Sequence, residues 1–365
     1  MLDIALKLLK EITSHSYKAY IVGGFVRDHI LGINSNDIDI ATNATPKELK
    51  DIFSDILLPN EDYGSVTVIK NGIRFEITTF RKEITYVNNR KPIEIEYIDE
   101  LEEDLIRRDF TINTICMDEK GKIIDLLDGK KDIDNKLIKT VGSADKKFRE
   151  DSLRILRAIR FATVLDFSLD KDIVKAINKN KKLLKSLSYY RKREELDKIF
   201  TSTNYKKGVQ LLLDLGLEEE LEIPNLHRIL DSDKISLLGI WSILNVTDKY
   251  PFNKNEVELI NNTNRALTMD NLDPNTLYTL GLYVNSVVGE IKGIDIKKIT
   301  EAYASLPIKS KKDIDIKTED IIKLLDKAPG SYLRDIYNDI EREILYNRLN
   351  NDKGDISNYI LENYK

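Results

Sequence analysis

Hydrophobic and polar positions alternate in two different ways along the chain, and the pattern changes near residue 140. Before that point, short segments that are either continuously apolar or alternate between apolar and polar residues predict strands at residues 19–22, 66–69, 73–80 and 93–97. Asn71-Gly72 lies between the second and third of these runs. Both of these residues tolerate a positive φ, so they predict a tight β-hairpin.

After residue 140, apolar residues recur at helical spacing almost throughout. The predicted helices cover residues 148–165, 171–186, 191–200, 205–215, 318–326 and 331–350. No proline occurs between Pro92 and Pro224, which permits continuous helices there. We therefore predict an α+β fold, with an N-terminal mixed β-sheet head followed by an all-helical C-terminal region. Its parts are a head of residues 1–138, a helical neck of 139–203, and a helical body and tail of 204–365.

Composition agrees with a globular protein of two or three domains, since the chain has 365 residues of which 41% are apolar and 33% charged. No run approaches the roughly 18–20 apolar residues of a membrane span, and residues 1–10 lack a signal-peptide core. The single cysteine, Cys116, excludes an internal disulfide and is expected in the core. A cytoplasmic protein without a structural zinc site is therefore expected.

Net charge is informative about binding partners only when it is counted segment by segment along the chain. The total is −5, which by itself argues against a nucleic-acid partner. Residues 146–207, however, hold 18 Lys and Arg against 8 Asp and Glu, a local charge of +10. Such a block is either a solvated helical surface or a surface for a polyanion.

A glycine turn provides the first candidate for chemistry. The strand at 19–22 runs into Gly23-Gly24 and then into a predicted helix that carries Arg27 in its first turn. Backbone N–H groups at a helix N-terminus bind anions, and a glycine lets a phosphate approach closely. Arg27 adds further donors. Taken alone, a Gly-Gly pair is more often a simple turn.

Two carboxylates follow about a dozen residues later. Asp37 and Asp39 lie two residues apart, so in a strand both point to the same face. They are either part of a surface loop or the ligands of a cation. Oxygen ligands suit Mg²⁺, which binds one or two carboxylates together with substrate phosphates. After a phosphate-binding turn, this pattern favours two-metal phosphoryl or nucleotidyl transfer.

Together these motifs resemble the head of class II tRNA CCA-adding enzymes and the related bacterial poly(A) polymerases. The resemblance extends over about residues 20–200, through GGFVRD and DIDIAT, then RRDFTIN at 107–113, EDSLR at 150–154 and a looser ELDKI at 195–199. It implies that Asp37 and Asp39 are catalytic and hold Mg²⁺. It also implies that Gly24, Arg27 and Arg108 contact the nucleotide. Glu76 and Asp109 both remain candidates for a third acid.

The EDSLR block also has a chemical interpretation of its own. Asp151, Arg154, Arg157 and Arg160 recur every three residues, so one helix would carry them on one broad, drifting face. Cytosine and adenine both present an amino donor beside a ring-nitrogen acceptor. A carboxylate and a guanidinium match that pattern, whereas uracil and guanine present its reverse. Asp151 and Arg154 are the predicted base-reading pair, a role that the resemblance also implies, and Arg157 and Arg160 are predicted nucleotide-binding residues.

Two segments concern how closely the chain follows the family and which nucleotides it adds. The family's last motif usually begins with Glu-Arg, whereas this chain has Tyr190-Arg191, and we expect Tyr189 and Tyr190 to be packing residues. Residues 81–92 are polar and basic, as in a mobile loop. Members that add only CC tend to lack a full loop here, so its presence favours addition of both C and A.

The sequence therefore predicts an enzyme that adds CCA to tRNA 3′ ends from CTP and ATP without a template. Three alternatives stay open: a partial enzyme adding only A or only CC, a poly(A) polymerase, and a catalytically inactive RNA-binding module. The neck of residues 139–203 would select the nucleotide, and its basic block would contact the acceptor arm of tRNA. The helical body and tail of residues 204–365 would also bind tRNA, and the oligomeric state is not predicted.

Overall fold

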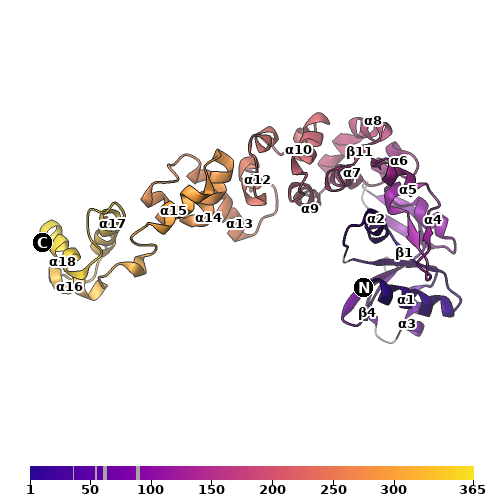
Figure 1. Ribbon diagram of the computed structural model, residues 1–365, viewed down its shortest axis with the longest axis horizontal. Coiled ribbons are helices and arrows are strands. Elements are labelled where there is room, and N and C mark those ends of the chain that lie inside the picture. Colours follow the sequence, from indigo (N-terminus) through magenta and orange to yellow (C-terminus); the bar gives the residue numbers. More distant parts are fainter. Residues whose placement is uncertain (36, 54–55, 61–63, 88–90) are drawn as a thin grey trace. The chain divides into compact units, whose positions relative to one another are not determined.

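The computed structural model describes residues 1–35, 37–53, 56–60, 64–87 and 91–365. These residues form two compact units, Met1–Glu222 and Ile223–Lys365 (Figure 1). The first unit contains the β-sheet, and the regular elements described in the second are all helical. None of the helices in these ranges is both long enough and apolar enough to cross a lipid bilayer.

The first unit begins with a mixed seven-stranded sheet of order β3-β4-β5-β2-β1-β8-β9. The strands are β1 (Ala19–Val22), β2 (Asp39–Thr42), β3 (Ile56–Asn60), β4 (Ser65–Lys70), β5 (Ile73–Thr79), β8 (Cys116–Met117) and β9 (Ile123–Ile124). Strand β2 pairs antiparallel with β1 and parallel with β5. The middle of the sheet therefore joins segments that are distant in sequence.

The hairpin prediction is confirmed, since β4 and β5 pair antiparallel around Asn71 and Gly72. Both turn residues have positive φ, at 53° and 76°. The expected loop at 81–92 is wrong for most of its length, because β6 (Arg81–Val87) and β7 (Lys91–Tyr97) form an antiparallel ribbon. Residues 88–90, at its tip, lie outside the described residues.

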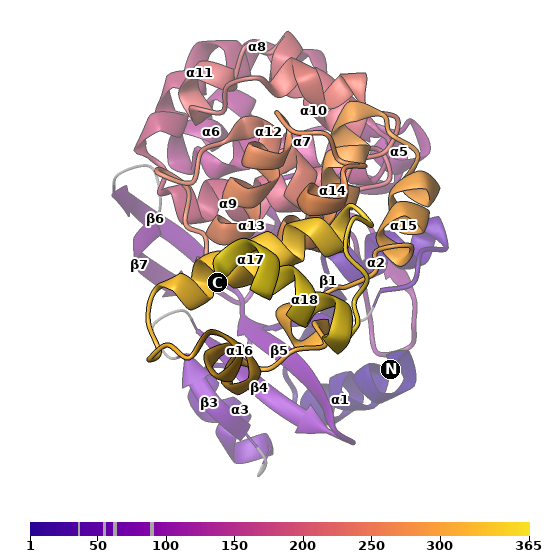
Figure 2. The same ribbon diagram turned by 90° about the vertical axis from the view of Figure 1, so that its left-hand side faces the viewer.

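Helices α1 (Leu2–Ser14) and α3 (Pro46–Ile52) lie next to each other and against strands of the sheet (Figures 1 and 2). Helix α1 buries an apolar stripe with helical spacing, at Ala5, Leu8, Leu9 and Ile12. Helix α3 begins with a capping box between Thr45 and Glu48. Cys116 is fully buried, as expected.

Helices dominate the rest of the first unit, beginning with α4 (Leu101–Ile106), which precedes the sheet strands β8 and β9 in the chain. The helices that follow are α5 (Gly129–Asp134), α6 (Ala144–Glu150), α7 (Leu153–Val164), α8 (Lys171–Asn180), α9 (Tyr189–Phe200), α10 (Tyr205–Asp214) and α11 (Glu218–Leu221). A two-stranded parallel pair, β10 (Leu137–Ile138) with β11 (Ser168–Leu169), interrupts this series. The predicted helix over 148–165 is wrong as a single element, because the chain breaks between α6 and α7 at Asp151 and Ser152.

Helices α7, α9 and α10 pack tightly together. A Cβ placed on Gly208 of α10 would lie 2.4 Å from Ile199 Cγ2 and 2.6 Å from Thr163 Oγ1. The absence of a side chain at Gly208 therefore allows α10 to approach the other two helices.

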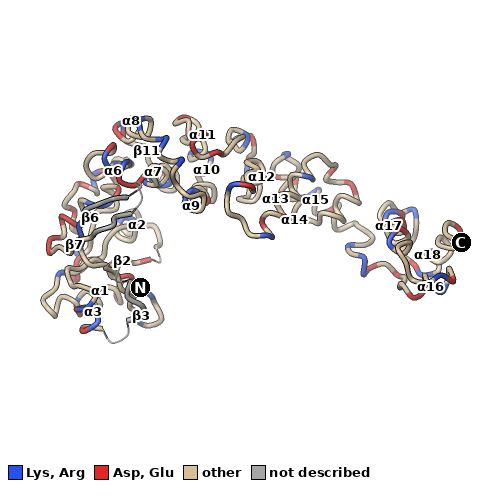
Figure 3. Tube along the Cα trace, turned by 180° about the vertical axis from the view of Figure 1, so that it is seen from behind, with Lys and Arg blue, Asp and Glu red and all other residues tan. Residues whose placement is uncertain are grey.

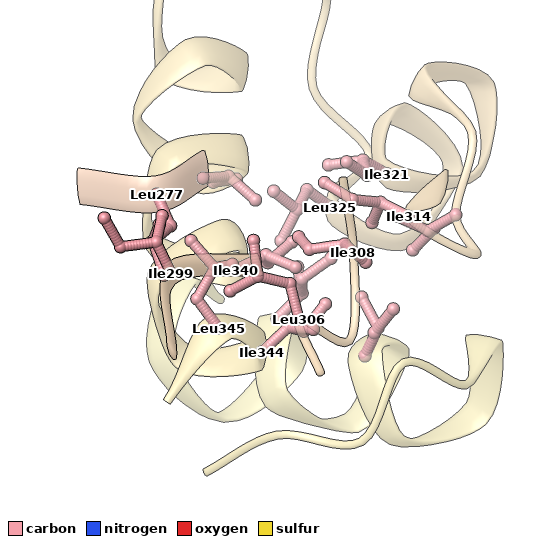
Figure 4. Packing of buried hydrophobic residues seen from close by; sticks show 14 residues of the cluster. Leu277, Ile299, Leu306, Ile308, Ile314, Ile321, Leu325, Ile340, Ile344 and Leu345 are labelled. Atoms are coloured by element: carbon pink, nitrogen blue, oxygen red, sulfur yellow. The ribbon is translucent and has the colours of Figure 1, made fainter. Parts of the chain in front are cut away.

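The second unit is built from α12 (Leu237–Leu244), α13 (Lys254–Ala266), α14 (Pro274–Lys292), α15 (Ile296–Ala304), α16 (Thr318–Leu325), α17 (Tyr332–Leu345) and α18 (Lys353–Tyr364). A cluster dominated by Ile and Leu, extending from Leu277 to Ile360, forms its C-terminal core (Figure 4). Helix α14 is broken at Gly281, which has φ 75° and ψ 169°. The buried Asn285 side chain donates to the Gly281 carbonyl at 2.8 Å and stabilises this break.

The predicted fold class is therefore confirmed: a mixed-sheet α+β head precedes a mostly helical C-terminal region. The boundary between the two observed units falls after residue 222, inside the segment that we assign to the body. The finer division into head, neck, and body with tail remains a proposal.

Candidate active site

One cleft of about 570 Å³ in the first unit brings together most of the predicted site residues. Among the residues that line it are four acids, Asp37, Asp39, Glu76 and Asp109, and seven arginines, Arg27, Arg81, Arg107, Arg108, Arg154, Arg157 and Arg160. Gly24 also lines it. Of the predicted site residues, Asp151 is not part of the described lining. A small group of acids beside many guanidinium groups suits a substrate with several negative charges.

The Gly23-Gly24 turn forms one wall of the cleft. Gly23 precedes helix α2 (Gly24–Leu31) with φ 77° and ψ −136°, a conformation that requires glycine. A Cβ on Gly23 would lie 3.5 Å from Arg108 Nη1 and 4.0 Å from Asp39 Oδ2. The turn, the α2 N-terminus, an arginine of the RRDFTIN block and a predicted metal ligand are therefore neighbours.

The acidic end of the cleft is formed at the start of β2. Asp37 and Asp39 are exposed while Ile38 and Ile40 are buried, which confirms the predicted alternation. Glu76 of β5 is the direct partner of Asp39 in the parallel β2–β5 ladder. Desolvation of the carboxylate within the cleft, followed by repulsion from Asp37 and Glu76, raises the pKa of Asp39 to about 6. Bringing a cation to these acids would relieve that repulsion.

Asp109, the other candidate for the third acid, is engaged differently. Its Oδ1 accepts from Phe110 N at 2.8 Å and from Asn113 Nδ2 at 3.1 Å. Its Oδ2 accepts from Arg157 Nε and Nη2 at 2.8 and 2.6 Å. Burial by itself would raise the pKa of Asp109, but Arg157 and the hydrogen bonds outweigh burial and hold it well below its usual range. Asp109 thus orients Arg157.

Asp104 of α4 is a residue to which the sequence analysis gave no role. Its carboxylate is buried, accepts from Arg107 Nε at 2.8 Å and lies 3.3 Å from Arg108 Nη2. It also accepts from the backbone N–H of Arg81, the first residue of β6, at 3.2 Å. The spacing of three and four residues within one chain segment could have revealed this contact, because such pairs are neighbours on a helix.

The predicted base-reading pair is split between two elements. Asp151 precedes α7 in an extended conformation, and its two oxygens accept from Leu153 N at 3.0 Å and Arg191 Nη2 at 3.1 Å. Arg154 lies in the first turn of α7 and donates to Glu150 at 2.8 Å. Arg191, which the chain keeps from the family's last motif, therefore contacts the predicted specificity residue. Tyr190 is 63% exposed, so the expectation that it packs is wrong.

Basic residues occur along α6 to α9, interspersed with acids (Figure 3). Several are neutralised locally: Lys179 lies 3.1 Å from Asp145, Lys185 lies 3.3 Å from Glu219, and Arg149 lies 2.8 Å from Asp145. Part of the +10 charge is thus balanced within the unit.

A strand that ends in a glycine turn, a second strand with two acids at its start, and an arginine-rich cleft define a nucleotidyltransferase. Three sequence models of known families match this chain. They are described as the poly A polymerase head domain (residues 19–139), a probable RNA and SrmB-binding site of polymerase A (166–230) and a putative tRNA nucleotidyltransferase domain 2 (243–360).

Curated relatives are similar in sequence to this protein over almost the whole chain. The CCA-adding enzyme of Ligilactobacillus salivarius is 36% identical over 96% of this chain and 93% of its own length. That of Listeria monocytogenes is 37% identical, covering 98% and 97%. The crystal structure of the Bacillus stearothermophilus CCA-adding enzyme in complex with CTP superposes with a TM-score of 0.85 at 30% identity, covering 98% and 96%. The chain belongs to the CCA-adding enzyme family of tRNA nucleotidyltransferases.

Proposed function

We propose that this protein adds the 3′-terminal CCA to tRNA from CTP and ATP, without a nucleic-acid template. The observation that carries the proposal is the cleft in which Asp39 and Glu76 of the sheet face the arginines of α2, of the segment after α4 and of α7. Full-length similarity to CCA-adding enzymes supports the choice of substrates. Because its substrate is tRNA, we also propose that the protein acts in the cytoplasm.

We assign catalysis to Asp37 and Asp39, which would hold Mg²⁺. Their exposed, oxygen-only donor set fits this ion, which takes one or two carboxylates and completes its shell with substrate phosphates and water. No three acidic, histidine or cysteine side chains in the described part of the chain are arranged to hold a metal by themselves. When bound, the metal would activate the primer 3′-hydroxyl and stabilise the departing pyrophosphate. Between the two candidates for a third acid, ladder pairing with Asp39 favours Glu76 over Asp109.

The remaining assigned residues would bind the nucleotide. Gly24 presents the N-terminus of α2 to the phosphates, and Arg27 and Arg108 add charged donors on either side of it. Arg157 and Arg160 extend this donor array along α7. These five residues line the cleft together, which supports a shared ligand.

Base selection is assigned to Asp151 and Arg154. We expect Asp151→Ala to loosen discrimination, so that UTP and GTP are incorporated at least ten-fold more often relative to CTP and ATP. The measurement is single-nucleotide incorporation into tRNA with each of the four nucleotides. Asp172→Ala, which removes an exposed acid on α8, is the matched control and should leave selectivity unchanged. Unaltered selectivity in Asp151→Ala would refute the assignment.

The function itself is tested with purified protein, Mg²⁺ and labelled CTP or ATP, offered to tRNA ending before CCA, after C and after CC. Incorporation of two C and one A, followed by termination, is the expected result. Removal of divalent ions with EDTA should stop it, and added Mg²⁺ should restore it. Asp39→Ala should abolish transfer. Its tRNA affinity should stay within about three-fold of the wild type, since this side chain lies at the acidic end of the cleft, where we place the metal and the nucleotide.

Other results would identify a different enzyme. Incorporation of A alone after CC, or of C alone, would indicate a partial enzyme, and long tails from ATP would indicate a poly(A) polymerase. tRNA binding without incorporation of any nucleotide would indicate an inactive RNA-binding protein. Strands β6 and β7 provide the segment that CC-adding members tend to lack, and this favours addition of all three nucleotides.

A further inference from the structure

Three guanidinium groups surround one aromatic ring at the junction of sheet and helices. The guanidinium carbons of Arg27, Arg157 and Arg160 lie 5.1, 5.4 and 4.3 Å from the ring centroid of Phe161. Arg27 comes from α2, whereas Arg157, Arg160 and Phe161 come from α7. Phe161 is 8% exposed and is one of the residues that line the cleft.

Each of the three arginines also has its own acidic partner. Arg27 Nη2 lies 2.7 Å from Asp28, and Arg160 Nη1 lies 3.0 Å from Glu195. Arg157 is held by Asp109, as described above. These acids belong to α2, to α9 and to the segment after α4. Arg27 Nη1 also donates to Asn113 Oδ1 at 2.7 Å, and Asn113 in turn donates to Asp109, so hydrogen bonds already connect Arg27 with Arg157 but not with Arg160. The ring of Phe161 is the group that all three arginines share.

The close approach of three like charges is unfavourable without compensation. Burial, followed by repulsion from Arg157, lowers the pKa of Arg160 to about 10, which still leaves the group charged near neutral pH. The face of an aromatic ring carries a partial negative potential and attracts cations, Arg above all. A leucine of similar burial would fill the space without providing that attraction.

We propose that Phe161 is a positioning residue for the nucleotide triphosphate, because its ring holds the guanidinium groups of α2 and α7 in one array that faces the cleft. This inference rests on the proposed function, since it assumes that Arg27, Arg157 and Arg160 bind phosphates. It assigns a role to a residue outside the predicted metal ligands and the predicted base-reading pair. The ring fixes the phosphate-binding helix and the base-reading helix in a single geometry.

A neighbouring phenylalanine provides the matched control. Phe110 meets Phe161 edge-on, with ring centroids 5.6 Å apart and an interplanar angle of 78°, and it is fully buried. Phe110→Leu therefore disturbs the same aromatic pair at a residue that is not part of the described cleft lining. If Phe161 acts only as a core residue, Phe161→Leu and Phe110→Leu should have equivalent effects.

The first measurement is the affinity of the full-length protein for inorganic tripolyphosphate, by calorimetry. Tripolyphosphate lacks base and sugar, so it reports on the phosphate array alone. We expect Phe161→Leu to weaken binding about ten-fold, which corresponds to about 1.4 kcal/mol and is of the size expected for cation–π contacts. Phe110→Leu should stay within about two-fold of the wild type, and Phe161→Tyr, which keeps the ring face, should restore most of the affinity.

The second measurement is steady-state C addition to tRNA. Phe161→Leu should raise KM for CTP about ten-fold and change kcat by less than three-fold, because the array binds phosphates before and during transfer. Equal shifts in Phe161→Leu and Phe110→Leu, or no rescue by Phe161→Tyr, would overturn the proposal. If Phe161→Leu lowers the melting temperature more than Phe110→Leu, Phe161→Met provides the comparison with a smaller loss of packing. Absence of C addition by the wild type would instead refute the proposed function.

Discussion

The carboxylate of Asp104 illustrates how a buried residue outside the recognised motifs can organise a site. It contacts the guanidinium groups of Arg107 and Arg108 and the backbone N–H of Arg81. Arg108 lines the cleft, and Arg81 begins the β6–β7 ribbon. One side chain thus connects a predicted substrate contact with the start of a neighbouring element.

We predict that Asp104→Asn destabilises the first unit by about 3 kcal/mol near neutral pH, because removing one member of a buried ion pair leaves the other charge uncompensated. Burial by itself raises the pKa of Asp104, but Arg107 and Arg108 outweigh burial and lower it. The charged form therefore stabilises the fold above an unfolded-state pKa of about 4. This contribution is lost as the pH falls through the lower folded-state pKa.

Denaturant unfolding of wild type and Asp104→Asn, at pH 7 and at pH 3, checks this prediction. The difference between the two proteins should be largest at pH 7 and smaller at pH 3. Glu103→Gln, which alters an exposed acid on the same helix, is the control. An Asp104→Asn penalty that is equal at both pH values would contradict an electrostatic origin.

For single residues, the sequence alone could predict those features of the site that depend on local spacing. Asp37 and Asp39 face the cleft together because a strand alternates its side chains. The choice between Glu76 and Asp109 could not be made from the sequence. It depends on the register between β2 and β5 and on the packing of Arg157, and both are set by residues far apart in the chain.

Among the elements, the break between α6 and α7 is the clearest difference from expectation. Periodicity alone predicted one helix, because apolar residues keep helical spacing on both sides of Asp151. Asp151 instead adopts φ −142° and ψ 108°, and its side chain caps the N–H of Leu153 at 3.0 Å. Asp and Ser favour such caps over helix interiors. Because of this break, Asp151 lies outside α7, the helix that carries the arginines, although only two residues separate it from Arg154 in the sequence.

Close packing of α10 leads to a prediction for Gly208. Gly208→Ala improves helix propensity by up to about 1 kcal/mol. The new methyl would overlap Ile199 Cγ2 and Thr163 Oγ1, and overpacking costs about 1–3 kcal/mol. We expect net destabilisation of α7, α9 and α10, seen as faster hydrogen exchange of their amides. Gln210→Ala, at an exposed position of the same helix, should leave exchange almost unchanged; slower exchange in Gly208→Ala would show that the helices adjust without cost.

For the whole molecule, the total charge of −5 conceals the basic residues of α6 to α9. We predict that tRNA affinity falls steeply with salt, because binding to a polyanion releases counterions. Replacing exposed Lys171, Lys182 and Lys185 with Gln should weaken binding and reduce the slope of log K against log salt by about 1 to 3. Filter binding between 50 and 200 mM KCl measures this slope.

The matched control changes basic residues of the second unit. Lys297, Lys298 and Lys312 are exposed, and substituting them with Gln gives the same change in total charge. Equal slopes for both triple variants would contradict a special contribution of the basic block to the salt dependence. A larger reduction of the slope in the variant of Lys171, Lys182 and Lys185 supports contact between that block and the tRNA backbone.

The parallel pairing of β2 with β5 has an evolutionary consequence. Asp39 and Glu76 are held opposite each other by a hydrogen-bonded ladder, although 36 residues separate them in the chain. Insertions or deletions in the connecting segment can therefore accumulate without moving either acid, provided that both strands keep their register. Length variation among natural variants should concentrate there, whereas a single-residue deletion inside either strand would turn its acid to the opposite face of the sheet.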